Sequence, residues 1–500
     1  MSPDDTETQE GVMDEPSRRQ LFLRVFPPIM LPVFLAVVDQ TIVATALPAM
    51  AATFGDVERI SWVVISYLVA NTIAAPVYGR LGDLFGRRLL MLISLCIFIV
   101  ASVLCALSGS VVALTLARVL QGLGGGGLMT LSQALIGESV PLRERGRFQG
   151  YLAGVIVCSS TFGPVAGGFL TQLFGWQSVF LVNLPLGILA FALVFRLPAH
   201  PRRGNRLHLD MPGLVLLSVF VTTLLLALER LQRFDRTALP AIAGLVLASL
   251  TALALLIRQE RRAREPLLPI RLLGQAAIWR ADAMAALSGA SLAGMVTFLP
   301  IYLQVVGHAS AGETGFIMLP LTAGVGIGSV LTGRYISRTG RTAIVPSVGL
   351  MFTACTLIAA GLLAPHLTSW ELAWLIAAGG ICQGSAMPVA QLTVQHLSGS
   401  AMLGAGAASV QLSRSLGSAL GVAVVGAVLF LVLSSSDNHT AALFADMVEQ
   451  GPKAMTGLSA AQQAAVQAQI AAAFSAAFFA IACFSCALSA AAWSLPMRRL

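Results

Sequence analysis

The chain has 500 residues, of which 56% are hydrophobic and only 11% are charged, whereas an ordinary soluble domain has roughly 25% charged residues. Such a composition excludes a water-soluble protein, because too few charged side chains are present to cover a surface in contact with water. The net charge of +8 does not indicate a nucleic-acid partner, since the basic residues are spread over separate loops, where anionic lipid headgroups are the expected neighbours.

About fourteen apolar runs reach roughly 18 residues, the length that a helix needs to span a bilayer. They begin near residues 25, 60, 89, 111, 147, 177, 211, 238, 276, 313, 342, 369, 402 and 471. The sequence before the first run is acidic and polar, and that run is too long to be the apolar part of a signal peptide. We therefore expect residues 1–23 to form a disordered cytoplasmic tail.

The basic residues predict the orientation of the spans. With the N-terminus inside, 24 of the 31 Lys and Arg residues fall on the inner side, five fall outside, and Arg118 and Arg414 fall within helices. Cytoplasmic loops carry an excess of basic residues of this kind. We therefore expect both termini in the cytoplasm and residues 434–468 in an outer loop.

The first span contains a carboxylate. The sequence "PPIMLPVFLAVVDQTIVATALP" (27–48) places Asp39 well inside the membrane, where a charge costs about 2.5 to 3.5 kcal/mol on insertion scales. Arg118 lies at a comparable depth in the fourth span, and Gln121 follows one helical turn later. We expect the two charges to meet. They form either a fixed salt bridge that locks two helices or a proton-coupling pair that opens when Asp39 is protonated.

The second span ends in a motif that the chain repeats. The sequence "GRLGDLFGRR" (79–88) recurs as "GRYISRTGRT" (333–342), each time after a helix that begins outside. The separation of the copies corresponds to one six-helix half and two additional helices, which predicts six, two and six spans. In the first copy Asp83 is an acid within a basic loop and needs a partner, whereas Ser337 takes its place in the second copy.

The fourth span contains "RVLQGLGGGGLM" (118–129), whose glycines at 122, 124 and 127 match the dinucleotide pattern G-x-G-x-x-G. That pattern binds a pyrophosphate only when a β-strand leads into it, and here an apolar helix precedes it. The glycines predict instead that neighbouring helices approach closely.

The fifth span contains "GPVAGG" (163–168). Pro164 removes one helix hydrogen bond, and Gly163, Gly167 and Gly168 give the helix a smooth face. Such a face suits either sliding between two conformers or simple tight packing.

Charged residues are rare in the later spans. Asp282 lies near the inner end of the ninth span and Glu313 at the outer start of the tenth, where each is either a helix-terminal charge or a contact for a proton or cation. Arg414 lies in the thirteenth span. The six histidines and seven cysteines show no metal-ligand spacing, and we expect neither a metal nor a cofactor.

These motifs, in this order, resemble those of the major facilitator superfamily, in particular its fourteen-span drug:proton antiporters. Residues 79–88 resemble the superfamily's cytoplasmic loop motif, 118–127 its fourth-helix motif and 163–168 its antiporter motif. The sequences "DQTIVATALP" (39–48) and "FGWQSVFLVNLPLG" (174–187) are similar to the fourteen-span branch. The resemblance implies an all-α polytopic membrane protein with the major facilitator fold.

The domain organisation follows from the resemblance and the repeat together. Residues 24–200 are expected to form an N-terminal six-helix bundle, and residues 275–500 a C-terminal six-helix bundle that includes the outer loop. Residues 201–274 would supply two additional transmembrane helices with basic linkers. The expected arrangement is therefore 14 helices as 6+2+6.

The resemblance also implies roles for individual residues. Asp39 would be the first-helix acid of proton or substrate coupling, and Arg118 the fourth-helix arginine of a proton relay. The cytoplasmic gate would contain Gly79, Asp83, Gly86, Arg87 and Arg88, with Glu138 as their partner acid. The secondary candidates for the substrate cavity or the proton path are Gln121, Asp282, Glu313 and Arg414.

The predicted function is the proton-coupled export of amphipathic drugs across the bacterial inner membrane by alternating access. Export of one physiological metabolite and uptake of a solute are the alternatives within transport. A receptor or an enzyme would need a signalling domain or a catalytic constellation, and the sequence offers neither. The expected partners are a small amphipathic substrate, protons and membrane lipids, and a periplasmic adaptor protein is a further candidate.

Overall fold

The structure is a computed structural model that describes residues 15–55, 59–198, 210–232, 239–263, 266–268, 270–436, 440, 443–444, 447 and 459–496. Within these residues the fold is helical, and 14 segments are long and apolar enough to cross a membrane. The predicted fold class of an all-α polytopic membrane protein with fourteen spans is thereby confirmed.

The spans are described in chain order. The first helices are α1 (Glu15–Phe54), α2 (Trp62–Phe85), α3 (Arg87–Ala106), α4 (Val111–Ser139), α5 (Leu142–Phe174) and the pair α6 (Ser178–Leu181) and α7 (Asn183–Phe195). A hairpin of α8 (Met211–Gln232) and α9 (Leu239–Arg262) follows, and then the short α10 (Ile270–Leu273). The remaining helices are α11 (Ala276–Val305), α12 (Ala311–Thr339), α13 (Ile344–Leu363), η2 (Ala364–His366), the pair α14 (Ser369–Gln383) and α15 (Ala386–Ser398), α16 (Leu403–Ser436) and α18 (Ala460–Trp493).

The first helix begins earlier than the sequence analysis predicted. Residues 15–23, which we expected in a disordered tail, belong to α1, because Pro16 is tolerated in the first turn and no proline or glycine follows until Pro27. The good helix formers Arg, Gln and Leu occupy the intervening positions. Residues 1–14 lie outside the described residues.

The predicted outer loop is shorter than expected for a similar reason. Residues 434–436 belong to α16, and α18 already begins at Ala460, where Ser459 and Gln462 form a capping box. The alanine-rich sequence that follows has a high helix propensity. Most of the intervening segment lies outside the described residues.

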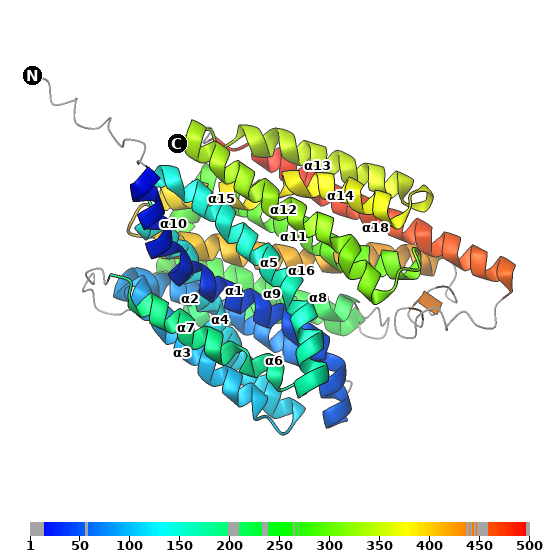
Figure 1. Ribbon diagram of the computed structural model, residues 1–500, viewed down its shortest axis with the longest axis horizontal. Helices are drawn as coiled ribbons and strands as arrows, with labels where there is room; N and C mark the ends of the chain where they lie inside the picture. Colours follow the sequence, from blue (N-terminus) through cyan, green and yellow to red (C-terminus); the bar gives the residue numbers. More distant parts are fainter. Residues whose placement is uncertain are drawn as a thin grey trace, which may run out of the picture.

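The helices form two groups that lie side by side (Figure 1). One group contains α1 to α7 and the other contains α11 to α18, and the groups are joined where α5 packs against α12 and α2 packs against α16. The hairpin of α8 and α9 packs on α2 and α16 through an apolar cluster that includes Phe220, Leu256 and Leu412. It therefore covers one seam between the two groups.

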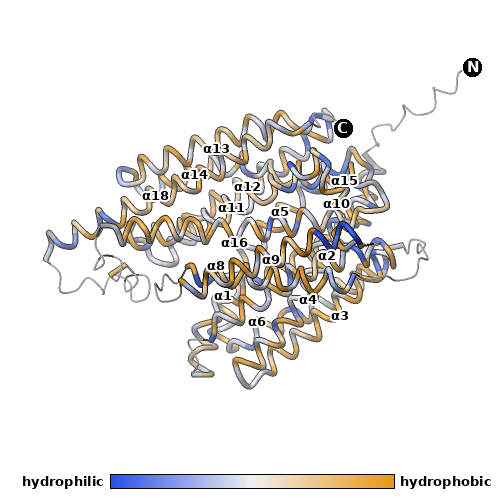
Figure 2. The backbone as a smooth tube through the Cα atoms, turned by 180° about the vertical axis from the view of Figure 1, so that it is seen from behind, coloured by the Kyte–Doolittle hydropathy of each residue, from blue (hydrophilic) through white to orange (hydrophobic). Residues whose placement is uncertain are grey.

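The outer surface of the bundle is apolar along its length. Figure 2 shows the hydrophobic segments in the body of the helices and hydrophilic segments mainly at their ends. Large apolar side chains such as Leu116, Phe169, Leu247 and Phe352 are half exposed or more. A soluble protein does not expose so many, and this surface suits contact with lipid tails.

The two groups touch at one end of the bundle, where α1 begins and α18 ends (Figure 1). We call this end, which carries Arg87 and Arg338, the basic end, and the opposite one the far end. At the basic end the Nε2 of Gln395 in α15 donates to the carbonyl oxygen of Gln133 in α4 over 2.9 Å. Toward the far end, the ribbons of α1 and α6 diverge from those of α12 and α18.

Two glycine contacts allow this close approach. A Cβ atom added at Gly79 of α2 would lie 2.8 Å from the Cβ of Ala408 and 2.9 Å from the carbonyl carbon of Gly404, both in α16. On the other side, a Cβ added at Gly333 of α12 would lie 2.8 Å from the carbonyl carbon of Gly146 in α5. Gly79 and Gly333 are the first residues of the two copies of the repeated motif. The repeat therefore has a structural meaning, since each copy begins at a contact with the opposite group.

We predict that Gly79→Ala loosens the basic end without unfolding the protein. The added methyl group collides with backbone atoms of α16, which cannot rotate away as a side chain can. Maleimide labelling of Ala407→Cys, which is fully buried on α16, should become about tenfold faster in a cysteine-free background, as expected for a change of about 1.4 kcal/mol in the closed state. Gly154→Ala in α5, where an added Cβ meets no atom within 4 Å, is the control. Equal labelling in both variants would contradict the prediction.

Candidate functional site

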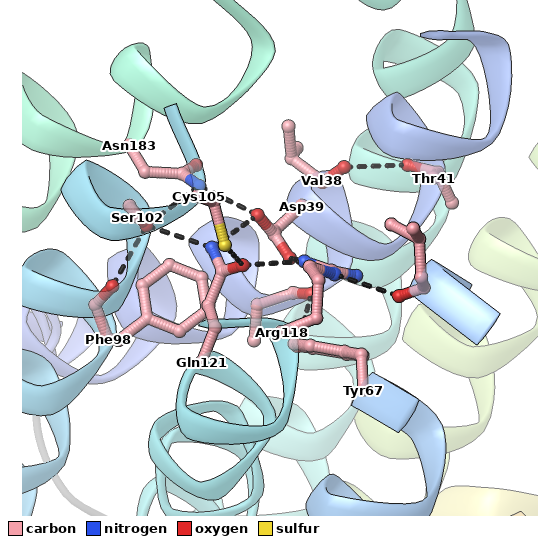
Figure 3. A network of polar contacts seen from close by, with 12 residues as sticks. Val38, Asp39, Thr41, Tyr67, Phe98, Ser102, Cys105, Arg118, Gln121 and Asn183 are labelled. Atoms are coloured by element: carbon pink, nitrogen blue, oxygen red, sulfur yellow. Dashed lines mark hydrogen bonds and ion pairs between the residues drawn. The ribbon is translucent and has the colours of Figure 1, made fainter. Parts of the chain in front are cut away.

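Asp39 of α1 and Arg118 of α4 form an ion pair inside the first group of helices (Figure 3). The Nη1 of Arg118 lies 2.6 Å from the Oδ2 of Asp39, and the two residues are 1% and 0% exposed. The structure therefore brings the two charges together, as expected. Because both side chains are excluded from water, neither charge can be left without a partner.

The other carboxylate oxygen of Asp39 accepts hydrogen bonds from neutral donors. The Nε2 of Gln121 and the Nδ2 of Asn183 both donate to the Oδ1 of Asp39, over 2.8 and 2.7 Å. Gln121 also accepts a hydrogen bond from the Nη1 of Arg118 over 2.7 Å and donates to Ser102 over 2.8 Å. Figure 3 shows that these side chains come from α1, α3, α4 and α7 and point toward one another.

The guanidinium group of Arg118 has two further partners in α2. Its Nε donates to the carbonyl oxygen of Val63 over 3.2 Å, and its Cζ lies 4.1 Å from the centre of the Tyr67 ring. A cation over an aromatic face is stabilised by the ring quadrupole. Arg118 is therefore held in place by α1, α2 and α4 together.

The antiporter motif packs directly against the helix that carries Asp39. A Cβ atom added at Gly163 would lie 2.9 Å from the Cβ of Thr41, and one added at Gly167 would lie 2.7 Å from the carbonyl oxygen of Ile42. Gly168 meets nothing within 4 Å, and α5 continues through Pro164 without a break. Two of the three glycines thus set the distance between α5 and the segment that follows Asp39.

The glycine run of α4 packs on two neighbours at once. An added Cβ would meet backbone atoms of Tyr67 at Gly122 and of Phe98 at Gly124, and a side-chain atom of Ser94 at Gly127. These neighbours belong to α2 and α3. The close approach of helices that the sequence indicated is what the structure shows, and it brings Arg118 within reach of its partners.

A second charged cluster lies at the basic end. Arg87 pairs with Asp83 and with Glu138, each over 2.7 Å, so the three residues that resemble gate charges are brought together. Arg87 also donates to the carbonyl oxygen of Ser400 over 3.3 Å. The cluster therefore joins α2, α3 and α4 of the first group to the segment before α16.

Asp83 also caps a helix of the opposite group. Its Oδ1 accepts from the N–H of Gly404 over 2.9 Å, and its Oδ2 accepts from the N–H of Ala405 over 3.0 Å. Both donors lie in the first turn of α16, where backbone N–H groups lack helical partners and the helix dipole favours a negative charge. Asp83 thus holds the two groups together at the basic end.

The other residues of the motif have local roles. Gly86 ends α2 with a φ of 94°, which favours glycine, and allows the turn into α3. Arg88 donates to the carbonyl oxygen of Phe195, and the Cζ of Arg88 lies 5.2 Å from the centre of the Phe195 ring. These two residues shape the loop and fix α3 to α7.

The candidates of the second group do not join either cluster. Asp282 accepts a hydrogen bond from Ser409 over 3.2 Å. Glu313 is exposed at the start of α12 and forms a capping box with Ser310, whose N–H donates to its carboxylate over 2.8 Å. The Nη2 of Arg414 donates a hydrogen bond to the Oε1 of Gln411 over 3.3 Å.

Sequence reasoning missed Asn183 and Ser102 as partners of Asp39. Asn183 lies in the quoted segment 174–187, where it is an amide within an apolar run, and a buried amide needs hydrogen-bond partners. That signal would have singled it out. Its direction toward Asp39 depends on how α7 is rotated, which the sequence does not reveal.

These features define the chain as a polytopic membrane protein with two helix groups that meet at one end. The family model of the Major Facilitator Superfamily matches residues 29–422, and the chain belongs to this superfamily.

The curated relatives include a multidrug transporter and an amino acid uptake transporter. An uncharacterized MFS-type transporter of Mycobacterium tuberculosis is 34% identical over 83% of this chain and 60% of its own length. The multidrug transporter protein MdtP of Bacillus subtilis is 30% identical, over 80% of this chain and 74% of its own. A vacuolar membrane amino acid uptake transporter of Schizosaccharomyces pombe is 28% identical, over 82% of this chain and 72% of its own. The chain thus spans 60% of the length of the mycobacterial relative. All three relatives are transporters by name, not enzymes.

The fold has solved counterparts. The crystal structure of the human organic anion transporter MFSD10 (TETRAN) matches with a TM-score of 0.64 at 15% identity, over 94% of this chain and 99% of that one. This likeness concerns the fold alone.

We predict that Asp83→Asn weakens the contact between the groups. The neutral side chain of Asn cannot form the ion pair with Arg87. Its amide nitrogen also takes the place of one of the two carboxylate oxygens that accept hydrogen bonds from α16. Transport per folded molecule should fall about tenfold or more, because about 1.4 kcal/mol in the balance of two states is tenfold. Dye efflux from energised cells, normalised to the amount of protein in the membrane, is the measurement. Ser337→Ala, at the equivalent position of the second motif copy, is the control, and unchanged efflux in Asp83→Asn would rule out this role.

Proposed function

We propose that the protein is a secondary transporter that exports small amphipathic compounds in exchange for protons. The observation that carries this proposal is the ion pair of Asp39 and Arg118, a titratable pair buried at the junction of five helices. In a membrane such a pair is costly and marks a functional site by default. Two states of the pair, closed and open, would give two conformations of the helices that it joins.

The proton would act at Asp39. In the closed pair, the carboxylate accepts hydrogen bonds from Arg118, Gln121 and Asn183. A proton on Asp39 would remove the attraction to Arg118 and leave the guanidinium group short of a partner. Since α1 also carries Thr41 and Ile42, which contact the antiporter motif of α5, a shift of α1 would reach α5 directly.

The gate would act at the basic end. Asp83 binds the first turn of α16, and its release would free one contact between the groups. Alternating access requires that the two groups separate at one end while they close at the other. Because the two groups touch at the basic end, the structure would correspond to the state of this cycle that is open toward the far end.

The organisation and placement of the chain complete the proposal. We infer that residues 24–200 and 275–500 are the two six-helix halves and that residues 201–274 add two helices, which the packing of α8 and α9 across α2 and α16 supports. The bacterial relatives support placement in a cytoplasmic membrane, with the basic end and both termini in the cytoplasm. A periplasmic adaptor remains a predicted partner only.

The direction of transport has one competing candidate. The relative from Bacillus subtilis is a multidrug transporter by name, whereas that from Schizosaccharomyces pombe is an amino acid uptake transporter. The antiporter motif favours export for this chain. Uptake of a solute by proton symport would use the same ion pair with the opposite direction of substrate movement.

We predict that the basic end faces the cytoplasm. An alkaline phosphatase fused after Leu500 should be inactive, and a fluorescent protein fused there should fluoresce, because these reporters work on opposite sides of the membrane. The basic side chains of the loops cause this orientation. A phosphatase that is active at this position would show the reverse topology.

We predict that Asp39→Asn abolishes proton-driven accumulation while the protein still binds substrate. The amide nearly preserves the shape of the site but cannot exchange a proton. In liposomes with an imposed pH gradient, uphill substrate movement should fall by about tenfold or more relative to wild type, since the chemical drive is uncoupled.

Two further variants separate coupling from structure. Arg118→Lys keeps the charge but loses the planar fork that reaches Asp39, Gln121 and Val63 together, and it should impair uphill movement. Arg334→Lys, an exposed position on α12, should not. If Asp39→Asn pumps uphill at the rate of wild type, Asp39 is structural and Asp282 becomes the next acid to test.

A further inference from the structure

Arg414 differs from Arg118 in how its charge is compensated. Arg118 has a carboxylate, an amide, a carbonyl oxygen and an aromatic ring around it. Among the residues that the structure describes, the guanidinium group of Arg414 makes one hydrogen bond, from its Nη2 to the Oε1 of Gln411 over 3.3 Å. Its Nε is buried without a partner. A buried donor without a partner carries a desolvation cost that a ligand could remove.

No ion pair joins Arg414 to an acid in the part of the chain that the structure describes. Asp282, on the adjacent helix α11, is hydrogen-bonded to Ser409 instead. Ser409 precedes Arg414 by more than one turn of α16, and the carboxylate of Asp282 is directed to that earlier turn. The positive charge of Arg414 is therefore not neutralised by the nearest acid of the neighbouring helix.

The position of Arg414 on α16 shows where its side chain lies. Residues 407, 411, 414 and 418 form one stripe on a helix with 3.6 residues per turn. Ala407 and Gln411 are 0% and 7% exposed near the basic end, where the two groups touch, whereas Arg414 and Ser418 are partly exposed. Gly404, at the start of α16, packs on α2, whereas Gly421, seven residues after Arg414 and on the same stripe, packs on Ala290 of α11. Ser418 also borders α11, since a Cβ added at Gly289 would lie 2.8 Å from its Oγ. Arg414 thus lies beyond the closed contact, on the side of α16 that borders α11, and its side chain is partly exposed.

We propose that Arg414, supported by Gln411, binds the anionic group of the transported compound. This inference rests on the proposed function and names its substrate class: amphipathic compounds with a carboxylate, sulfonate or phosphate group. A guanidinium group offers a planar set of donors that fits such oxyanions in a bidentate manner. The partial exposure of the side chain gives a ligand access, and its Nε lacks a hydrogen-bond partner that a ligand could supply.

A matched pair of probes tests the charge preference. Pyrenebutyrate and (pyrenylbutyl)trimethylammonium share one ring system and differ in the sign of the head group, and energy transfer from the six tryptophans to pyrene reports binding. Wild-type protein in phosphatidylcholine nanodiscs should bind the anion about tenfold more tightly than the cation or better, as expected for a charge-assisted pair. Equal affinity, or a preference for the cation, would overturn the proposal without the use of any variant.

Variants locate the site. Arg414→Gln should lower the affinity for pyrenebutyrate about tenfold and leave that for the ammonium probe unchanged or higher, while Arg414→Lys should retain most of the anion affinity. Arg334→Gln, an exposed position, serves as the control and should bind as wild type does. An Arg414→Gln protein that binds the anion normally shows that the site lies elsewhere and overturns the proposal.

Two more arms separate the sources of the anion and the two levels of inference. Nanodiscs that also contain phosphatidylglycerol should leave pyrenebutyrate binding intact; its loss would mean that a lipid phosphate occupies Arg414, and the proposal would fall. In proteoliposomes with a pH gradient, uphill movement of the cationic probe alone would uphold transport but refute the anion site. Binding of the anion at Arg414 without movement of either probe would uphold the site and refute the proposed function.

Discussion

The desolvation of Asp39 and Arg118 is the constraint on which the first group of helices depends. Two charges that are withdrawn from water must compensate each other and must also satisfy their remaining donors and acceptors. The structure meets this requirement with side chains and carbonyl groups from five helices, α1, α2, α3, α4 and α7. Because each of these helices contributes at least one residue to the network, their rotations about their own axes are fixed with respect to one another.

The glycines of α4 allow the helices to come close enough for that network to form. An arginine reaches a carboxylate on another helix only when the backbones are close, and Gly122, Gly124 and Gly127 remove the side chains that would keep α2 and α3 away. The same helix then carries Glu138 to the basic end, where it pairs with Arg87. A displacement of α4 along its axis would therefore alter both charged clusters, which lie at different depths.

Much of this could be inferred from the sequence. The length and polarity of the apolar runs gave the fourteen spans, and equal depth in the first and fourth spans placed Asp39 opposite Arg118. The sequence left Glu313 as either a helix-terminal charge or a contact for a proton or cation, and in the structure it forms a capping box with Ser310 at the start of α12. These successes share one property: each depends on depth or on spacing within a single helix.

The contacts that the sequence did not reveal depend on the rotation of helices or on distant segments of the chain. Asn183 faces Asp39 because of the way α7 turns, and no periodicity in an apolar run distinguishes that face. Asp83 needed a partner, and the sequence offered the nearby Arg87. Sequence reasoning could not foresee the N–H groups of Gly404 and Ala405, since backbone donors leave no trace in the sequence and become available only where a helix begins.

The two glycine contacts at the basic end are unequal in their chemistry, although the repeat makes them equivalent in position. Between α2 and α16 the backbones are also held by the carboxylate of Asp83, whereas between α5 and α12 Ser337 occupies the corresponding place. A separation at the first seam breaks the charge-assisted bonds of Asp83, while a separation at the second moves apart glycines that pack against Val330 and Ile336. The free energy needed to separate the two groups at the basic end therefore depends on which of the two helix pairs separates.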